Sequence, residues 1–270
     1  MTATINQADD GPVRILTLAN PAKRNAFSGD MASRLRALLL EADQDASVRA
    51  IVITGDANTF SSGHDLQEVL DNPETAGDPE ANAAFTLPAE LGTPVVAAVN
   101  GAAYAAGFIL ALNCDIRIAG RNAKFCAVGA RIGLVPVGGQ LSRLLDVVTY
   151  PVAFKMLTTA APVDADAARA SGFVSDVCDP ADTLARALAL AHQIAEVSPA
   201  VVRAIKTGLR VTLHDGLDVG NALEPRLAAV VRDLPDGNEG VQSFLQKRPP
   251  QYPDAPTDLQ DKLDKAGADR

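Results

Sequence analysis

The chain has 270 residues, of which 47% are apolar and only 4% aromatic, and its formal net charge at pH 7 is −9. A chain of this length buries roughly three quarters of the surface that its unfolded form exposes, so a sizeable core is available in one large domain or two small ones. The acidic balance disfavours nucleic acid and membranes as partners, because their anionic surfaces would repel the protein as a whole.

A first strand is predicted at residues 14–18, and Ser28 is a suitable N-cap for a helix that runs to residue 42. Further strands are predicted at residues 50–54, 95–99, 115–119, 124–127 and 174–178. Helices are predicted at residues 140–148, 151–158, 165–170, 181–197, 199–211 and 217–232. Periodicity alone therefore predicts an α/β protein with a helical C-terminal part.

Three other segments have less regular patterns. Residues 1–11 are polar, so no signal peptide is expected. Residues 68–88 are polar and contain Ala, Asn, Pro and Gly, which favours a mobile flap over a core element. Residues 249–270 begin with several prolines and continue as a charged stretch, so a flexible tail, or one laid along a neighbouring subunit, is expected.

The longest apolar stretch and the cysteines bear on location. Residues 94–112 are rich in Ala and Gly and are split by Asn100-Gly101, which predicts a strand, turn and helix of the core rather than a membrane span. Cys114, Cys126 and Cys178 lack CxxC spacing, and the three histidines form no HExxH motif. Neither disulfides nor a metal site are expected, and a cytoplasmic location fits.

Two glycine-containing segments carry the strongest functional signal. Residues 60–66 read Phe-Ser-Ser-Gly-His-Asp-Leu, and residues 100–107 read Asn-Gly-Ala-Ala-Tyr-Ala-Ala-Gly. Each follows a predicted strand and opens an apolar helix, so each presents free backbone N–H groups at a helix N-terminus. Two such ends directed at one point make an oxyanion hole.

With these segments and four further landmarks, the chain resembles the crotonase superfamily, the enoyl-CoA hydratase/isomerase family. The further landmarks are residues 23–27 (Lys-Arg-Asn-Ala-Phe), 114–116 (Cys-Asp-Ile), 133–139 (Gly-Leu-Val-Pro-Val-Gly-Gly) and 244–249 (Phe-Leu-Gln-Lys-Arg-Pro). The resemblance implies a spiral of ββα turns over residues 1–195 with the CoA and acyl site. It also implies a helical oligomerisation region over residues 196–248, in a homotrimer or a dimer of trimers.

The resemblance also implies a set of site residues. The backbone N–H groups of His64 and Ala106 would be the oxyanion donors. The expected substrate and CoA contacts are Lys23, Arg24, Ala26, Ser62, Gly63, Asp65, Leu66, Tyr104, Ala105, Gly107, Val128, Gly129 and Leu134, with Phe244 and Lys247 supplied by a neighbouring subunit. The substrate would be an acyl-CoA, with coenzyme A as part of the substrate and no prosthetic group.

One departure from the family pattern concerns the acid and base. The family hydrates an enoyl thioester with two glutamates, and their positions hold Ile109 and Gly129 here. The resemblance is to a branch that lacks them, so an enoyl-CoA hydratase role is expected although the standard mechanism is doubtful. A non-catalytic acyl-CoA-binding protein, an acyl-CoA decarboxylase and a thioester hydrolase are the alternatives.

Replacement acids, bases or nucleophiles were sought near the two segments. Asp65, Glu68, Arg131 and Asp146 are candidates, although each is more simply a cap, a flap residue, a surface charge or a helix partner. Cys126 is the only soft nucleophile near the second missing glutamate, and a buried inert thiol is its simpler interpretation. The imidazole of His64 is a further candidate, because its pKa lies near neutrality.

Overall fold

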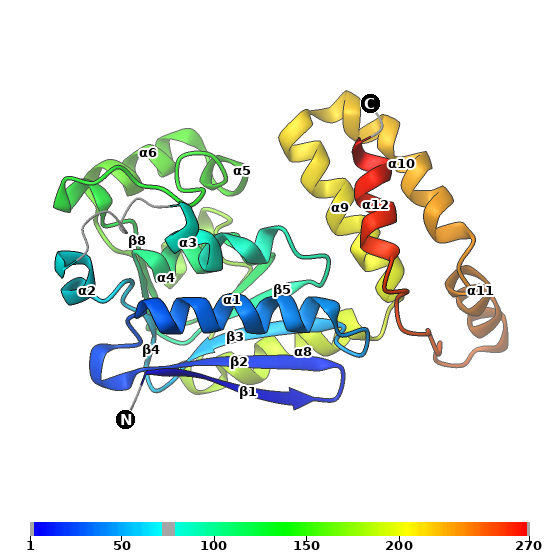
Figure 1. The fold of residues 1–270 in the computed structure, drawn as a ribbon, viewed down its shortest axis with the longest axis horizontal. Coiled ribbons are helices and arrows are strands. Elements are labelled where there is room, and N and C mark those ends of the chain that lie inside the picture. Colours follow the sequence, from blue (N-terminus) through cyan, green and yellow to red (C-terminus); the bar gives the residue numbers. More distant parts are fainter. Residues whose placement is uncertain (1–2, 72–78, 269–270) are drawn as a thin grey trace.

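The computed structural model describes residues 3–71 and 79–268, and two sheets organise them. The larger sheet has the order β1 (Thr4–Asp10), β2 (Val13–Ala19), β3 (Ala50–Gly55), β5 (Val95–Val99), β7 (Ile116–Gly120) and β10 (Asp176–Cys178). The smaller sheet has the order β4 (Thr59–Ser61), β6 (Ala102–Tyr104), β8 (Lys124–Cys126) and β9 (Val163–Asp164). β2, β3, β5, β7 and β10 run parallel, and β1 pairs antiparallel at the edge (Figure 1).

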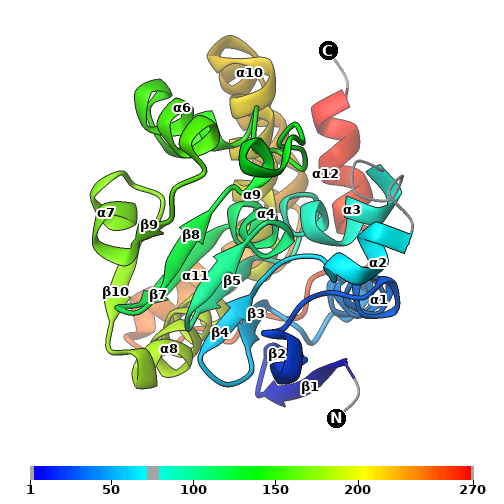
Figure 2. The ribbon, with the colours of Figure 1, turned by 90° about the vertical axis from the view of Figure 1, so that its left-hand side faces the viewer.

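The chain alternates between the two sheets. β3 of the larger sheet leads to β4 of the smaller one and then to α2 (Leu66–Asp71), and β5 leads to β6 and α4 (Ala106–Asn113). β7 and β8 repeat the step before the 3-10 turn η4 (Gly129–Ile132). This is the repeated ββα unit that the resemblance implied. Figure 2 shows β4 and β8 of the smaller sheet next to β3, β5 and β7 of the larger one. The expected α/β spiral is confirmed.

Two layers of helix cover the larger sheet, because its central strands are buried on both faces. Ile51 and Ile53 of β3 pack with Leu38 of α1 (Gly29–Gln44), while the alternate residue Val52 packs with Ala187 of α8 (Thr183–Ala195). Successive side chains of a strand point to opposite faces, so α1 and α8 lie on opposite sides of the sheet. As expected, Ser28 caps α1 by accepting a hydrogen bond from the Met31 N–H at 3.2 Å.

Several predicted elements differ from the observed ones. β1 was not predicted, because only Ile5 of this edge strand is buried and its other residues follow no apolar alternation. The helix predicted at residues 140–148 is reduced to α5 (Leu144–Val147). The helices predicted at 151–158 and 165–170 are present as α6 (Tyr150–Thr159) and α7 (Ala165–Ala170). No helix of the described residues is long and apolar enough to cross a membrane.

The expected mobile flap is wrong for part of its span. Residues 66–71 form α2 and residues 79–86 form α3 (Pro79–Thr86), while residues 72–78 lie outside the described part. Phe85 of α3 is fully buried and Ala84 nearly so, both within the main core. These small and aromatic residues bury a helix face that the polar composition of the segment concealed.

Four helices form the C-terminal part: α9 (Pro199–Asp215), α10 (Leu217–Arg232), α11 (Asp236–Gln246) and α12 (Leu259–Ala268). The flexible tail expected at residues 249–270 is corrected over its described part. Leu259 and Leu263 of α12 are buried in a separate apolar cluster with Leu223 and Leu227 of α10, and Figure 1 shows α12 lying between α9 and α10. Leucines spaced by four residues give α12 an apolar face, which its high charge obscures.

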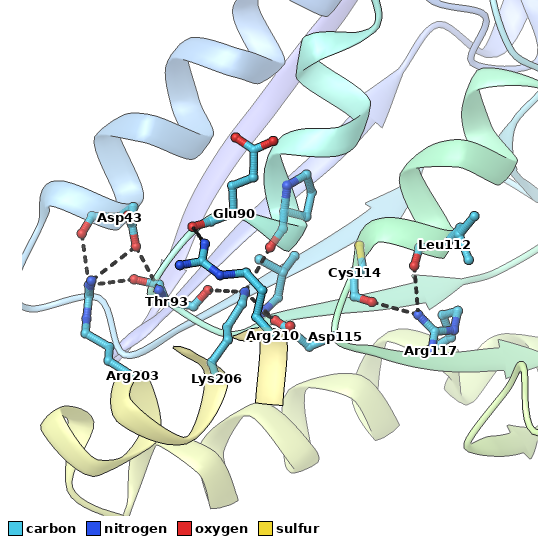
Figure 3. A network of polar contacts seen from close by, with 12 residues as sticks. Asp43, Glu90, Thr93, Leu112, Cys114, Asp115, Arg117, Arg203, Lys206 and Arg210 are labelled. Carbon is cyan, nitrogen blue, oxygen red and sulfur yellow. Dashed lines mark hydrogen bonds and ion pairs between the residues drawn. The ribbon is translucent and has the colours of Figure 1, made fainter. Parts of the chain in front are cut away.

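A row of basic side chains on α9 ties these helices to the spiral core (Figure 3). The Lys206 ammonium donates to Asp115 Oδ2 at 2.7 Å, to the Pro88 carbonyl at 2.8 Å and to the Thr93 carbonyl at 3.2 Å. One turn earlier, Arg203 pairs with Asp43 at 3.3 Å and donates to Thr93 Oγ1 at 2.7 Å. Residues three or four apart share one helix face, so α9 presents this row to the core as a unit.

A second buried cation, Arg117 of β7, holds the end of α4. Its guanidinium donates to the carbonyls of Ala111 at 3.2 Å, Leu112 at 3.4 Å and Cys114 at 2.7 Å, and to that of Phe173 at 2.5 Å. The last carbonyls of a helix have no partner within the helix. Arg117 therefore satisfies the C-terminus of α4, a helix whose every residue is buried.

We expect Lys206→Met to lower the free energy of unfolding by about 2–4 kcal/mol, because two carbonyls and a carboxylate oxygen lose a largely buried donor. Urea denaturation followed by circular dichroism measures this change. Lys155→Met is the matched control, since Lys155 is exposed, and its effect should stay within about 0.5 kcal/mol. Equal losses in the two variants would contradict this role of Lys206.

Candidate active site

The first glycine-containing segment is fixed by pairing with Phe27. The Phe27 N–H donates to the Gly63 carbonyl and the Asp65 N–H donates to the Phe27 carbonyl, both at 2.8 Å. The Gly63 carbonyl and the His64 N–H belong to one trans peptide, and no described peptide bond is cis. Since the carbonyl points to Phe27, the N–H of His64 points the opposite way.

The second segment is fixed in the same manner. Ala105 donates its N–H to the Cys126 carbonyl at 3.1 Å and accepts from the Ile109 N–H at 2.9 Å. The Ala105 carbonyl is thereby turned into the first turn of α4, and the Ala106 N–H of the same peptide points out of the helix N-terminus. This donor is one of the first four in a helix, which have no partner within it.

Two glycines allow these segments to touch. A Cβ atom on Gly63, whose φ is +105°, would lie 2.6 Å from the Ala105 Cβ and 3.3 Å from the Ala106 nitrogen. A Cβ atom on Gly107 would lie 2.5 Å from the Ser61 carbonyl oxygen. Only glycine fits at either position, and the close approach places the Ala106 nitrogen beside the Gly63–His64 peptide.

Ala105 carries backbone strain at this contact. Its φ of 48° and ψ of −118° lie outside the regions that an L-residue readily adopts. Such conformations cost about 1–3 kcal/mol and persist where the surrounding structure enforces them, often at functional sites. Here the pairing of β6 on one side and the start of α4 on the other impose the turn.

His64 and Ala106 both line a cavity of about 300 Å³, which we call the His64 cavity. Most of its walls are apolar, so water is partly excluded and electrostatic interactions inside it are strengthened. Its lining consists of Ser62, His64, Leu66, Val69, Asn82, Ala105, Ala106, Ile109, Val128, Gly129, Arg131, Ile132, Leu134, Val135, Pro136, Val137 and Gln140.

The His64 cavity gathers part of the expected site. Its lining includes His64, Ala106, Ser62, Leu66, Ala105, Val128, Gly129 and Leu134 from that set. Gly63 and Gly107 are adjacent, as their contacts with Ala105 and Ser61 show. Tyr104, Ala26, Lys23, Arg24 and Asp65 do not line it. Phe244 belongs to α11 and Lys247 is the C-cap of that helix, which Figure 1 shows at the other end of the molecule from α2.

The two expected CoA cations differ in their surroundings. Lys23 forms an ion pair with Asp65, and this hydrogen bond holds the pKa of the Asp65 carboxyl below its usual value and raises that of Lys23. Arg24 is exposed and makes no ion pair with any residue that the structure describes. Arg24 is therefore the cation of this pair that remains available to a phosphate.

The positions of the two missing glutamates lie in the cavity wall. Ile109 of α4 and Gly129 of η4 both line the cavity. A Cβ atom on Gly129 would lie 2.8 Å from the Leu134 carbonyl oxygen, so the following loop closes tightly over this position. A Cβ atom on Gly138 would lie 2.6 Å from Ile109 Cγ2, so Ile109 fills the space beside that loop.

Most of the replacement groups considered from sequence have structural roles. Asp65 is paired with Lys23, and Glu68 Oε2 accepts the Gly29 N–H at 2.8 Å at the start of α1. Asp146 on α5 is not part of the cavity lining. Burial raises the pKa of the Cys126 thiol, whose Sγ lies 3.3 Å from the Ala160 carbonyl. Asp65 is therefore part of an ion pair, Glu68 caps α1, and Cys126 is an inert buried thiol.

His64 differs from these groups, because its imidazole lines the cavity. Its Nε2 lies 3.3 Å from Asn82 Oδ1, and the ring meets Phe85 edge-on with centroids 5.2 Å apart. Burial lowers the pKa of His64, outweighing the opposing effects of Asn82 and the Glu68 charge. The imidazole is therefore neutral at pH 7 and can accept a proton.

Sequence analysis missed two polar residues of the cavity. Asn82 comes from α3, within the segment expected as a flap, and is 4% exposed. Gln140 is 5% exposed, donates to the Val137 carbonyl at 2.8 Å and has no partner for Oε1 in the described part of the chain. Neither belongs to a motif, so only the structure relates them to His64.

The ββα spiral, the two converging backbone donors and the adjoining apolar cavity define a protein of the crotonase type. The enoyl-CoA hydratase/isomerase family model matches residues 9–255. The chain belongs to this family, which confirms the resemblance noted in the sequence.

Individual relatives are similar over most of the chain. The 2,3-dehydroadipyl-CoA hydratase of Escherichia coli (strain K12) is 38% identical over 242 residues, covering 89% of this chain and 94% of the relative. The mitochondrial enoyl-CoA hydratase domain-containing protein 3 of Homo sapiens is 34% identical, covering 90% and 82% respectively. The crystal structure of an enoyl-CoA hydratase from Polaromonas sp. JS666 has a TM-score of 0.86 and 31% identity, covering 93% of this chain and 100% of that one.

We expect Ala105→Gly to raise the free energy of unfolding by about 1 kcal/mol, because the strain that glycine relieves is larger than the extra unfolded-state entropy that glycine introduces. Thermal and urea unfolding measure the change. Ala111→Gly, in the interior of α4, is the control and should lower stability by about 1 kcal/mol or more. A loss of similar size at both positions would contradict the strain at Ala105.

Proposed function

We propose that this protein acts on an acyl-CoA thioester, with the thioester oxygen held between the backbone N–H groups of His64 and Ala106. Enoyl-CoA hydration is the reaction best supported. The observation that carries the proposal is the close approach of the two segments, which directs two donors away from their own secondary structure and toward one cavity. Family membership and the similarity to the 2,3-dehydroadipyl-CoA hydratase of Escherichia coli support it.

The backbone donors supply the electrostatic part of the reaction. Attack on an enoyl thioester moves negative charge onto the thioester oxygen, and a donor fixed in advance stabilises that charge without reorganising. Removal of one such donor costs roughly 3 kcal/mol of barrier, a factor of about 10²–10³ in rate. Since the donors are backbone groups, alanine at position 106 serves as well as glycine.

Decarboxylation is the second candidate, favoured by the absence of Asp and Glu among the described residues that line the His64 cavity. A malonyl-type thioester loses carbon dioxide to give an enolate, and an oxyanion hole stabilises that enolate without a base. Thioester hydrolysis would need a nucleophile or a general base. Binding of acyl-CoA without turnover is the remaining alternative.

We propose that coenzyme A enters as part of the substrate, with Arg24 contacting its phosphates, and that no prosthetic group is needed.

We also propose a homotrimer or a dimer of trimers in which Phe244 and Lys247 reach a neighbouring subunit's site. Phe244 is 82% exposed. A stripe of apolar side chains on α9, comprising Val201, Ile205, Leu209 and Leu213, is also exposed, as an interface between copies would require.

The first test is hydration of trans-2-enoyl-CoA at several chain lengths. The reaction is measured as the loss of absorbance of the conjugated thioester. His64→Pro removes one proposed donor and should lower kcat/KM by about 10²–10³-fold. Circular dichroism and binding of a saturated acyl-CoA establish that the variant is folded. Unchanged turnover in a folded His64→Pro protein would overturn the oxyanion hole.

Substrate specificity separates the candidates. Release of carbon dioxide from malonyl-CoA without hydration would assign decarboxylation, and release of free thiol would assign hydrolysis. Tight acyl-CoA binding with no product from any of these substrates would assign a binding protein.

Restoring the family glutamates together should not increase hydration. Gly129→Glu places its Cβ against the Leu134 carbonyl, so we expect the Ile109→Glu/Gly129→Glu protein to unfold at a lower urea concentration and to gain no activity. Gly237→Glu is the control for adding a glutamate at a glycine, since nothing lies within 4 Å of a Cβ atom there. A stable double variant with faster hydration would contradict this expectation and would show that the loop containing Leu134 moves to accommodate the glutamate.

A further inference from the structure

The His64 cavity contains few groups that can move a proton. Among the described residues that line it, the ionisable side chains are His64 and Arg131. An arginine stays protonated under all ordinary conditions and cannot serve as a base. The imidazole of His64 is the one lining group that can both accept and return a proton near neutrality.

The ring of His64 is held in one orientation. Asn82 lies within hydrogen-bond distance of Nε2, at 3.3 Å, and Phe85 packs edge-on against the ring. Both partners come from α3 and are buried, Asn82 at 4% exposure and Phe85 at 0%. A side chain held by buried neighbours is already oriented for reaction, which reduces the entropy lost on reaching the transition state.

The hydrogen bond also assigns the tautomer. The Asn82 carbonyl oxygen is an acceptor, so the proton of the neutral imidazole lies on Nε2. Nδ1 then carries the lone pair, and within the described part of the chain it makes no hydrogen bond. Nδ1, which can accept a proton, thus belongs to His64, the residue whose backbone N–H would bind the thioester oxygen.

Burial and a nearby charge act on the ring in opposite directions. The Glu68 carboxylate acts to raise the pKa of His64, but it is engaged with the Gly29 N–H, and burial of the ring dominates and lowers the pKa. The resting imidazole is therefore a base and not an acid.

We propose that the imidazole of His64 is the acid–base group of this site, acting through Nδ1, and that Asn82 is a positioning residue that fixes its tautomer. This inference rests on the proposed function, because it places the reacting acyl-CoA at the His64 and Ala106 N–H groups. It assigns to one side chain the proton transfers for which the described lining residues supply no carboxylate.

The step balances with water as the only co-reactant. Nδ1 takes a proton from a water molecule while the water oxygen bonds to the β-carbon, and the electron pair of the carbon–carbon double bond shifts to leave an enolate whose charge rests on the thioester oxygen. The imidazolium then returns its proton to the α-carbon. One water has been added, and His64 is neutral again.

His64→Gln tests the side chain separately from the backbone, because glutamine keeps the N–H donor. We expect kcat/KM for enoyl-CoA hydration to fall about 10²–10⁴-fold, with binding of a saturated acyl-CoA and the unfolding temperature retained. His192→Gln is the matched control, since His192 pairs with Asp10 at 3.0 Å on the surface, and its activity should equal that of the wild type. Full activity in His64→Gln would overturn the proposal and leave the backbone oxyanion hole standing.

The pH profile tests Asn82. The base works when neutral, so kcat/KM should fall on the acid side as His64 is protonated, below its usual pKa of 6.5. Asn82→Asp places a carboxylate beside Nε2 and stabilises the imidazolium, which should move this acid limb to higher pH by about one unit or more. Asn82→Leu should lower kcat with little change in KM. An unmoved acid limb in a folded Asn82→Asp protein would overturn the positioning role.

Hydrogen exchange tests the base without hydration. In deuterium oxide the wild type should exchange the α-hydrogens of a saturated acyl-CoA. Nδ1 removes one hydrogen, the imidazolium exchanges it for deuterium with the solvent, and a deuteron returns to the α-carbon; His64→Gln should not do this. Exchange without hydration would refute the hydratase function and keep the His64 base. Absence of exchange in the wild type, or equal exchange in both proteins, would refute the base.

Discussion

The site depends on how closely two stretches of backbone approach each other. Gly63 and Gly107 leave no room for a Cβ atom, and Ala105, which lies at this contact, has a strained conformation. The strain is supported by elements that are stable in their own right, namely the pairing of Phe27 with the first segment and the buried helix α4 behind the second. The positions of the two glycine-containing segments are therefore fixed by the surrounding strands and helices of the spiral.

This arrangement separates two parts of the chemistry. In the proposed reaction, stabilisation of negative charge would lie in the peptide backbone and would not depend on which side chains surround it. Proton transfer would lie in side chains, and Ile109 and Gly129 have none that can take part. A fold of this kind could retain its affinity for a developing oxyanion while the source and destination of the proton change, and His64 would contribute to both parts.

The sequence predicted the features that depend on local pattern. The buried strands at residues 50–54 and 95–99, the Ser28 cap and the two glycine-containing segments follow from apolar runs and turn residues, and the resemblance related them to one fold. It could not predict α3 or α12, whose packing faces are short and lie in polar surroundings. Asn82 was missed for the same reason, because its contact with His64 joins residues on different elements.

The buried Arg117 has a mechanical consequence for the site. Its guanidinium holds the last carbonyls of α4 and the Phe173 carbonyl together, while the first N–H of the same helix faces the cavity. At a rise of about 1.5 Å per residue, the two ends of α4 are roughly 12 Å apart. Since α4 is buried along its whole length, the Arg117 contacts at its C-terminus also help to fix the Ala106 N–H at its N-terminus. Arg117 itself does not line the His64 cavity.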